Sequence, residues 1–187
     1  ATFPITEYTQ DEITKAWSAI NQRFPRPEYE IRGALWNVGS PIRKGFLDTT
    51  PEDVQWSLES GLMSAFSFSR HFILAVKENT LDPANRKRGT LIFTGATASV
   101  RGNVFTSAFS ATKHGVRALS QSLAKEFGKM NIHVAHVGPL MLFQRFLRLI
   151  ESRHSLTARY SRTETRTSRL KEEIYQTSSS FPRVSPK

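Results

Sequence analysis

Two short apolar runs separated by one long amphipathic segment occupy residues 90–137. Residues 90–94 (TLIFT) and 131–137 (NIHVAHV) are rich in β-branched and aromatic residues, which is typical of buried strands. The segment between them, residues 107–128, repeats apolar side chains at helical spacing: Phe109, Val116, Leu119, Leu123 and Phe127. A strand, a helix and a strand in this order predict parallel strands joined by a right-handed crossover. The pattern therefore predicts an α/β fold.

A helix is predicted upstream, over residues 9–24. Thr9 and Glu12 have capping-box spacing, and an apolar stripe at helical spacing follows them. The stripe consists of Ile13, Ala16, Trp17, Ile20 and Phe24. A proline-containing break at 25–29 then leads into a strand within residues 30–39 (EIRGALWNVG), which ends at a glycine turn.

A second helix is predicted from Pro51 to about residue 77. Thr50 is the expected cap, because proline is favoured at the first helical position. The apolar pattern of this helix runs through Trp56, Leu62, Met63, Phe66 and Phe72. Residues 78–89 are polar and are predicted to form a surface loop, so helices and strands alternate up to Met141.

The alternation stops after Met141, which divides the chain into two parts. Residues 1–141 are predicted to form one domain, and residues 142–187 a disordered tail rich in Ser, Thr and Arg. A net charge of +10 raises the question of a nucleic-acid partner, but +6 of it lies in residues 144–187. We therefore expect no nucleic-acid partner for the domain. The tail is interpreted as a solvated appendage or the product of an altered splice or reading-frame junction near residue 138; weak binding to nucleic acid or acidic surfaces is the alternative.

Composition bears on location and on metal binding. No apolar run approaches the roughly 20 residues that a membrane-spanning helix needs, and the start of the chain lacks the features of a signal peptide. The absence of cysteine fits the cytoplasm, where we expect the protein. His133 and His136 are three residues apart in a predicted strand and would face opposite sides, so we expect no metal site.

Several landmarks in residues 1–141 occur in the order found in one known family. Trp36-Asn37-Val38-Gly39 resembles an N-N-A-G turn, Ala111-Thr112-Lys113 stands where A-S-K is usual, and Val137 to Pro139 stands where V-x-P-G is usual. The Thr50–Asp53 helix start, Gly95 and Gly102 add to the match. Together they resemble the short-chain dehydrogenase/reductase family. The resemblance implies a partial Rossmann-like, doubly wound parallel sheet with strands three to six of the family fold, residues 1–5 (ATFPI) being the third.

The catalytic positions of this family are mostly altered. Lys113 is present, but Phe109 occupies the position of the tyrosine that transfers a proton, and Ala96 that of the serine that orients the carbonyl. A family asparagine in the preceding helix aligns most nearly with Gly61. The resemblance therefore implies a divergent subgroup with impaired catalysis. Hydroxyls near the lost serine could substitute for it, the candidates being Thr97, Ser99, Ser107 and Ser110, although loop and helix-cap bonding is the simpler interpretation.

The resemblance also implies a dinucleotide cofactor, NAD or NADP. The expected binding residues are Asn37, Gly39, Lys113 and Pro139, with the Lys113 ammonium on the ribose hydroxyls; the alternative for Lys113 is a solvated helix lysine. The T-G-x-x-x-G-x-G turn that holds the pyrophosphate is not in the sequence, so we expect weak cofactor binding. The chain has no initiator methionine and is expected to be truncated at its N-terminus, leaving the fourth family strand with an open edge.

Two functions follow from the resemblance. The first is an NAD(P)-dependent oxidoreductase acting on a carbonyl or alcohol, catalytically impaired in this chain. The second is a non-catalytic dimerisation or interaction module, because the family pairs the helices corresponding to 51–77 and 107–128 across a twofold axis. A homo-oligomer is expected in either case. The side chains expected at that interface are Phe66, Phe72, Leu119 and Leu123.

Overall fold

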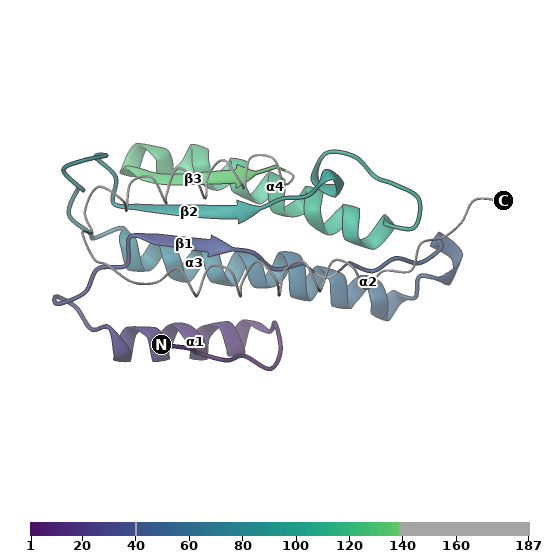
Figure 1. Ribbon diagram of the computed structural model, residues 1–187, viewed down its shortest axis with the longest axis horizontal. Coiled ribbons are helices and arrows are strands. Elements are labelled where there is room, and N and C mark those ends of the chain that lie inside the picture. The colour runs from purple at the N-terminus through teal and green to yellow at the C-terminus, as the bar shows by residue number, and fades with distance from the viewer. Residues whose placement is uncertain (40, 139–187) are drawn as a thin grey trace, which may run out of the picture. The chain divides into compact units, whose positions relative to one another are not determined.

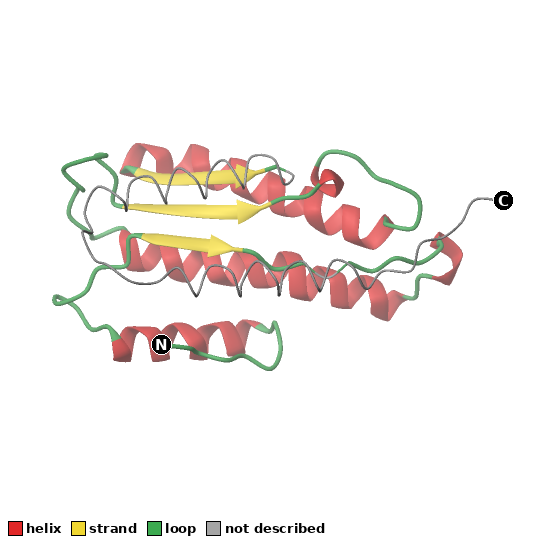
Figure 2. Ribbon diagram, in the orientation of Figure 1, coloured by secondary structure: helices red, strands yellow, loops and turns green. Residues whose placement is uncertain are grey.

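The computed structural model describes residues 1–39 and 41–138 (Figures 1 and 2). Within them, three strands and four α-helices, with short 3-10 and π segments, alternate along the chain. The strands are β1 (Gly33–Trp36), β2 (Gly89–Thr94) and β3 (Ile132–Val137), and the helices are α1 (Gln10–Arg23), α2 (Pro51–Leu58), α3 (Ser64–Val76) and α4 (Ser107–Phe127). The predicted helices and the strands after residue 30 are thus confirmed, with small shifts at their ends.

The three strands form one parallel sheet in the order β1-β2-β3. Gly33 pairs with Thr90, and Gly89 pairs with Ile132, so each neighbouring strand is reached through a helical crossover. The helix α3 precedes β2 and α4 precedes β3, as the labels and colours of Figure 1 show. This is the predicted α/β architecture, and it places the carboxyl ends of all three strands at the same edge of the sheet.

One hydrophobic core fills the space between the helices and one face of the sheet. Its buried members are Ile13, Trp17, Trp36, Ala65, Phe72, Ile73, Val76, Leu91, Phe93, Val116, Leu119, Ile132 and Val134. The helix α1 joins this core through α3, where the Trp17 ring lies 5.5 Å from that of Phe68. Thr9 caps α1 by accepting a hydrogen bond from the backbone N–H of Glu12 (3.3 Å). The predicted cap and apolar stripe of this helix are therefore confirmed.

Residues 1–5 are not a strand, contrary to the prediction. In the doubly wound order 3-2-1-4-5-6, the third strand pairs with the second rather than the fourth. None of the described residues supplies that neighbour, so the backbone groups of this segment have no ladder to join. The sheet therefore contains counterparts of the fourth, fifth and sixth family strands. The predicted tail, residues 142–187, lies outside the described residues.

The predicted helix over 51–77 contains a π-helical segment, η2 (Glu59–Met63), between α2 and α3. A π turn holds one extra residue and shifts the phase of every side chain after it. The helix starts as predicted, with Thr50 and Asp53 forming a capping box and Pro51 in the first turn. We refer to α2, η2 and α3 together as the rod. The shift in phase occurs at Gly61, where the rod crosses α4.

Three of the four side chains expected at a subunit interface are packed within the chain instead. Phe72 is fully buried, Leu119 is buried, and Leu123 is partly buried against the core. Only Phe66 is exposed, at 56%. The apolar periodicity of a helix identifies a buried face but not what covers it, and here the sheet covers it. No helix in residues 1–39 and 41–138 has the length and apolar character needed to cross a membrane.

Candidate active site

The candidate site lies at the carboxyl ends of β1 and β2, where the first half of α4 passes beneath them. Lys113 reaches this edge from the second turn of α4 and is only 6% exposed. Its Nζ donates hydrogen bonds to the carbonyl oxygens of Val38 (3.1 Å) and Thr94 (3.0 Å). Thr94 is the last residue of β2 and Val38 lies two residues after the end of β1, so a single ammonium group links the ends of two neighbouring strands.

Burial has an electrostatic consequence for this lysine. Removing the ammonium from water lowers the pKa of Lys113, because desolvation disfavours the charged form. The two carbonyl oxygens replace part of its hydration, and the other described residues offer no hydrogen-bond acceptor to its third N–H donor. The interpretation of Lys113 as a solvated helix lysine is therefore wrong. A partly dehydrated donor at the edge of the sheet can bind a polar group from a ligand.

Phe109 lies one helical turn before Lys113, and Lys113 Nζ is 5.9 Å from the centre of its ring. Residues four apart share a helix face, so the spacing that places a tyrosine beside the lysine in the family is kept here. A benzyl ring offers the cation its π face but has no proton to give or accept. The geometry of the pair is retained, while the atom that would do the chemistry is absent.

Ala96 follows β2 and leaves the serine position without a polar side chain. Its backbone N–H donates to the Oγ of Ser99 (3.0 Å), which is fully buried. Ser110 Oγ and Thr106 Oγ1 hydrogen-bond each other at 2.9 Å at the start of α4. The hydroxyls of Ser99 and Ser110 are therefore engaged in local bonds, as the loop and cap interpretation predicted. Ser107 is exposed at the first position of α4, and Thr97 opens a 3-10 turn.

Gly61, at the approximate position of the family asparagine, lies within η2 and faces α4. A Cβ built on Gly61 would overlap the Cγ2 methyl of Thr112 and lie 3.7 Å from its Cβ. Thr112 is held in place because its Oγ1 donates to the Ala108 carbonyl (3.1 Å) and accepts from Ser57 Oγ (3.0 Å). The space for an asparagine side chain is thus already filled.

The residues expected to contact a cofactor are brought together in part. Gly39 follows β1, and a Cβ built on it would lie 3.9 Å from Lys113 Nζ, so the two positions are neighbours. Asn37 is exposed at the same strand end. Pro139 lies outside the described residues. Asn37, Gly39 and Lys113 therefore share the edge of the sheet where ligands of open α/β folds bind.

His136 belongs to this region, although the sequence reasoning did not select it. It pairs with Phe93 and shares the helix-facing side of β3 with Val134, whereas His133 faces the other way. The His136 Nε2 is buried without a hydrogen-bond partner among the described residues. Burial is the main cause of its lowered pKa, with smaller contributions from the charges of Arg117 and Lys113.

Gly95 explains how this ring fits. A Cβ on Gly95 would lie 2.7 Å from His136 Nε2, so any other residue would displace the imidazole. The signal in the sequence is an inward-facing histidine near the end of one strand together with a glycine directly after the neighbouring strand. The described residues contain no cluster of three or more His, Cys, Asp or Glu arranged to hold a metal ion.

The fold and the site together define a Rossmann-like protein with a buried lysine at the strand ends. Comparison with known families agrees, because the family described as short chain dehydrogenase matches residues 3–154. The chain therefore belongs to the short-chain dehydrogenase family. The match continues past residue 141, where the predicted domain ends.

The alignments with individual relatives include most of this chain but only about half of each relative. The chain is 28% identical over 138 residues to 12alpha-hydroxysteroid dehydrogenase of a Clostridium species, covering 73% of this chain and 49% of the relative. It is 26% identical over 139 residues to human 3-hydroxyacyl-CoA dehydrogenase type-2, covering 73% and 52%. The chain thus spans about half the length of the curated relatives it matches.

Solved structures give the same result. A short-chain dehydrogenase from Rhodopseudomonas palustris superposes with a TM-score of 0.59 at 30% identity, over 70% of this chain and 56% of that one. One from Streptomyces avermitilis gives a TM-score of 0.61 at 20% identity, over 71% and 44%, a likeness that concerns the fold alone.

Proposed function

We propose that this chain is the catalytic half of an NAD(P)-dependent carbonyl or alcohol oxidoreductase that has lost its proton-transfer groups. The carrying observation is the pair of Phe109 and Lys113, with Nζ 5.9 Å from the centre of a ring that has no hydroxyl. Lys113 and the two carbonyls that accept its hydrogen bonds are present. The tyrosine hydroxyl whose pKa the lysine would lower is absent, because Phe109 stands at that position. The chain is a pseudoenzyme of its family.

The chemistry explains why both lost groups matter. Reduction of a carbonyl requires a hydride at carbon and a proton at oxygen, and Phe109 cannot deliver that proton. A positioned acid or base typically contributes ~10²- to 10⁴-fold to the rate. Ala96 also removes a hydrogen bond to the oxygen on which charge develops. Ser99 does not replace it, because its side chain is fully buried and is not exposed to a substrate.

Cofactor binding by this chain is proposed to be weak. Lys113 retains a donor for a ribose hydroxyl, and Gly39 leaves space beside it. The glycine-rich turn that binds the pyrophosphate at a helix N-terminus is not in the 187-residue sequence. Fluorescence titration with NADH and with NADPH is the direct test. Saturable micromolar binding would contradict this part of the proposal.

A turnover assay tests the proposal as a whole. The purified chain is supplied with NADH or NADPH and a panel of ketones and aldehydes, and with NAD or NADP and the matching alcohols. We expect no turnover above that of a heat-denatured sample. Turnover by the unmodified chain that disappears in Lys113→Ala would falsify the proposal, because it would show that the site works without Ser and Tyr.

A second candidate function is a homo-oligomeric interaction module in the cytoplasm. One observation favours it, the group of large apolar side chains exposed on the rod formed by α2, η2 and α3. Trp56 is 52% exposed, Met63 63% and Phe66 56%. Large apolar side chains that gather on an exposed surface are typical of interaction sites. Light scattering of the purified chain at several concentrations separates an oligomer from a monomer.

A further inference from the structure

Lys113 is the only buried lysine in residues 1–39 and 41–138, and its hydrogen bonds suit an uncharged amine. Its Nζ has two acceptors, the carbonyl oxygens of Val38 (3.1 Å) and Thr94 (3.0 Å). An ammonium group has three N–H donors, whereas a neutral amine has two N–H donors and a lone pair. The two carbonyls therefore satisfy every donor of the neutral form, and they leave one donor of the charged form without a partner in the described part of the chain.

No carboxylate among the described residues pairs with Lys113 to hold it in the charged form. The side chains that share its electrostatic surroundings are His136 on β3 and Arg117 one turn further along α4, and neither is an anion. The ends of β1 and β2 contribute backbone carbonyls. Burial lowers the pKa of Lys113, so its neutral form is more populated near neutral pH than that of an exposed lysine.

The space beside Nζ is bordered by small or apolar groups. A Cβ built on Gly39 would lie 3.9 Å from Nζ, so the glycine leaves this side of the atom open. The centre of the Phe109 ring is 5.9 Å away, and Ala96, two residues after Thr94, has no polar side-chain atom. In the amine form, the lone pair occupies the tetrahedral position at Nζ that the two carbonyls leave free.

We propose that Lys113 is a nucleophilic amine that captures small aldehydes as a covalent imine. The Nζ lone pair attacks the carbonyl carbon, and the carbonyl oxygen leaves as water with the two hydrogens that the nitrogen carried. The protonated imine keeps one N–H, which donates to the Val38 or the Thr94 carbonyl. Its positive charge lies beside the π face of Phe109.

Phe109 makes this chemistry more favourable than a tyrosine at the same position would. A phenol oxygen beside Nζ would accept a hydrogen bond from the ammonium form, and a phenolate would stabilise its charge. The phenyl ring does neither, because it has no oxygen. The proposal goes beyond the function given above, since capture of an aldehyde needs neither a dinucleotide nor a proton-transfer group.

The test incubates the full chain with propanal and sodium cyanoborohydride at neutral pH. Hydride reduction fixes any imine as a secondary amine, and peptide mass spectrometry then measures the rate of labelling at each lysine. Each unit by which a lysine pKa falls raises the neutral fraction about tenfold, so we expect Lys113 to be labelled about tenfold faster than Lys125 or more. Lys125 is the internal reference, because it is exposed on the same helix.

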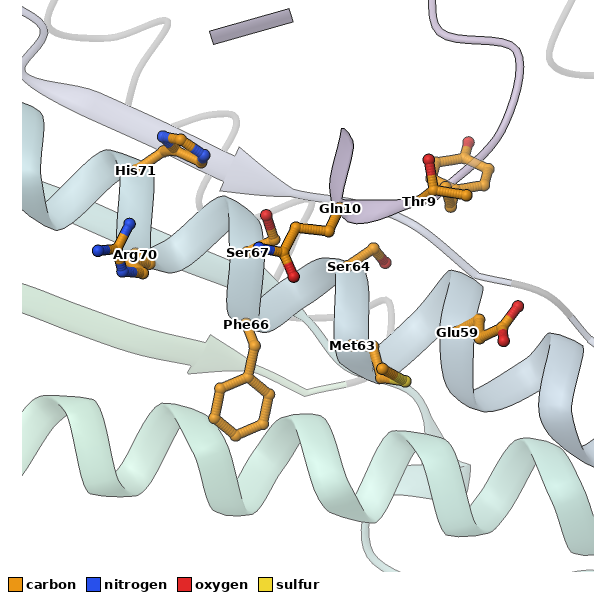
Figure 3. A pocket seen from close by; sticks show the side chains of 10 residues that line it. Thr9, Gln10, Glu59, Met63, Ser64, Phe66, Ser67, Arg70 and His71 are labelled. Carbon is orange, nitrogen blue, oxygen red and sulfur yellow. The ribbon is translucent and has the colours of Figure 1, made fainter. Parts of the chain in front are cut away.

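Non-covalent binding elsewhere does not disturb this measurement. A groove of about 600 Å³ lies between the start of α1 and the rod, where Figure 3 shows Arg70 and His71 among its lining side chains. No lysine lines this groove, so an aldehyde that enters it forms no imine there and leaves no reduced product.

Three comparisons assign the fast labelling to the folded site. Lys113→Arg keeps a cation but removes the nucleophile and should abolish the fast labelling, whereas Lys125→Arg should leave it unchanged. Phe109→Tyr keeps the lysine and should slow its labelling. In urea, the unmodified chain should be labelled at similar rates at Lys113 and Lys125, because unfolding removes the difference in their surroundings. Circular dichroism of each variant checks that it is folded.

The proposal is overturned if Lys113 of the folded chain is labelled no faster than Lys125. It is also overturned if the fast labelling persists in Lys113→Arg, or if Lys113 is labelled preferentially in urea as well. Reduction of a ketone by the unmodified chain with NADH or NADPH would contradict the proposed loss of catalysis instead. That result would leave the labelling comparison, and the capture site that it tests, unaffected.

Discussion

The Cγ2 methyl of Thr112 occupies the space that a side chain on Gly61 would need. The two residues belong to different helical segments, and their contact sets how closely η2 approaches α4. Both positions differ from the family pattern, since Gly61 stands near the usual asparagine and Thr112 at the serine of A-S-K. The methyl group of Thr112 therefore fills the space between η2 and α4 that faces Gly61.

Gly61→Asn is expected to destabilise the protein by about 1–3 kcal/mol, because overpacking a tight contact forces side chains and backbone to shift. Thr112→Ser removes the obstructing methyl and keeps the hydroxyl that contacts Ser57 and Ala108. The double variant should recover most of the loss, with a coupling energy of about 0.5–3 kcal/mol in urea denaturation. Additive effects of the two substitutions would show that the methyl is not the obstacle.

Lys113→Met is expected to lower the free energy of unfolding by about 1–3 kcal/mol. Methionine keeps the apolar stem but leaves the Val38 and Thr94 carbonyls without their donor, which costs more than the hydrogen bonds themselves contribute. Lys125→Met, at an exposed position of the same helix, is the control. Equal stability of the two variants in chemical denaturation would mean that Lys113 does not hold the strand ends.

The lowered pKa of Lys113 predicts a rise in stability under alkaline conditions. Between its folded pKa and the ordinary value of 10.5, the unfolded state binds more protons than the folded one, so the free energy of unfolding increases with pH. Below the folded pKa the penalty for burying the charge is fully present. Denaturation curves measured from neutral pH up to 10.5 should show this slope. Lys113→Met should flatten it.

Two histidines predict a loss of stability on mild acidification. Burial is the main cause of the lowered pKa of both His136 and His71, assisted by nearby cationic side chains. Protonation in the unfolded state near the ordinary value of 6.5 therefore favours unfolding, and stability falls as pH drops through that value. His136→Asn should reduce the slope of stability against pH in this range. His133→Gln, on the exposed face of β3, is the matched control.

Restoring the two lost groups is expected to be insufficient for turnover. The double variant Ala96→Ser and Phe109→Tyr regains the general acid and the carbonyl donor, but the chain still lacks the glycine-rich turn that fixes the cofactor. We expect no reduction of ketones with either reduced cofactor, measured by loss of absorbance. Turnover in the double variant would show that Lys113 and Gly39 alone position the dinucleotide.

The helices and the buried strands could be predicted because their signals are local. Thr9 and Thr50 cap helices at the predicted places, and the apolar run at β2 is long enough to identify a strand. The strand at residues 1–5 could not be judged in this way, since an extended segment becomes a strand only when a neighbour pairs with it. The sequence of that segment says nothing about the neighbour.

Other features depended on contacts between distant segments. The inserted residue of η2 leaves the apolar pattern almost unchanged. The only indication of the close crossing with α4 in the sequence was Gly61, whose missing side chain allows that approach. The sequence could not show whether Phe72 packs against the sheet or against a second subunit, because that depends on which side of the helix the sheet covers. Lys113 was selected from the sequence as a candidate site residue. Its two carbonyl acceptors could not be predicted, because they come from residues 75 and 19 positions away.

The parallel pairing of β1 with β2 also has a consequence for how the chain folds. Gly33 meets Thr90 only after the whole rod and the loop that follows it have been brought back, and Gly89 meets Ile132 only after α4 has done the same. No tight hairpin can start this sheet, so its formation requires closing two long loops. Such long-range closure slows folding, and the rod and α4, stabilised by local contacts, are expected to form before any two strands touch.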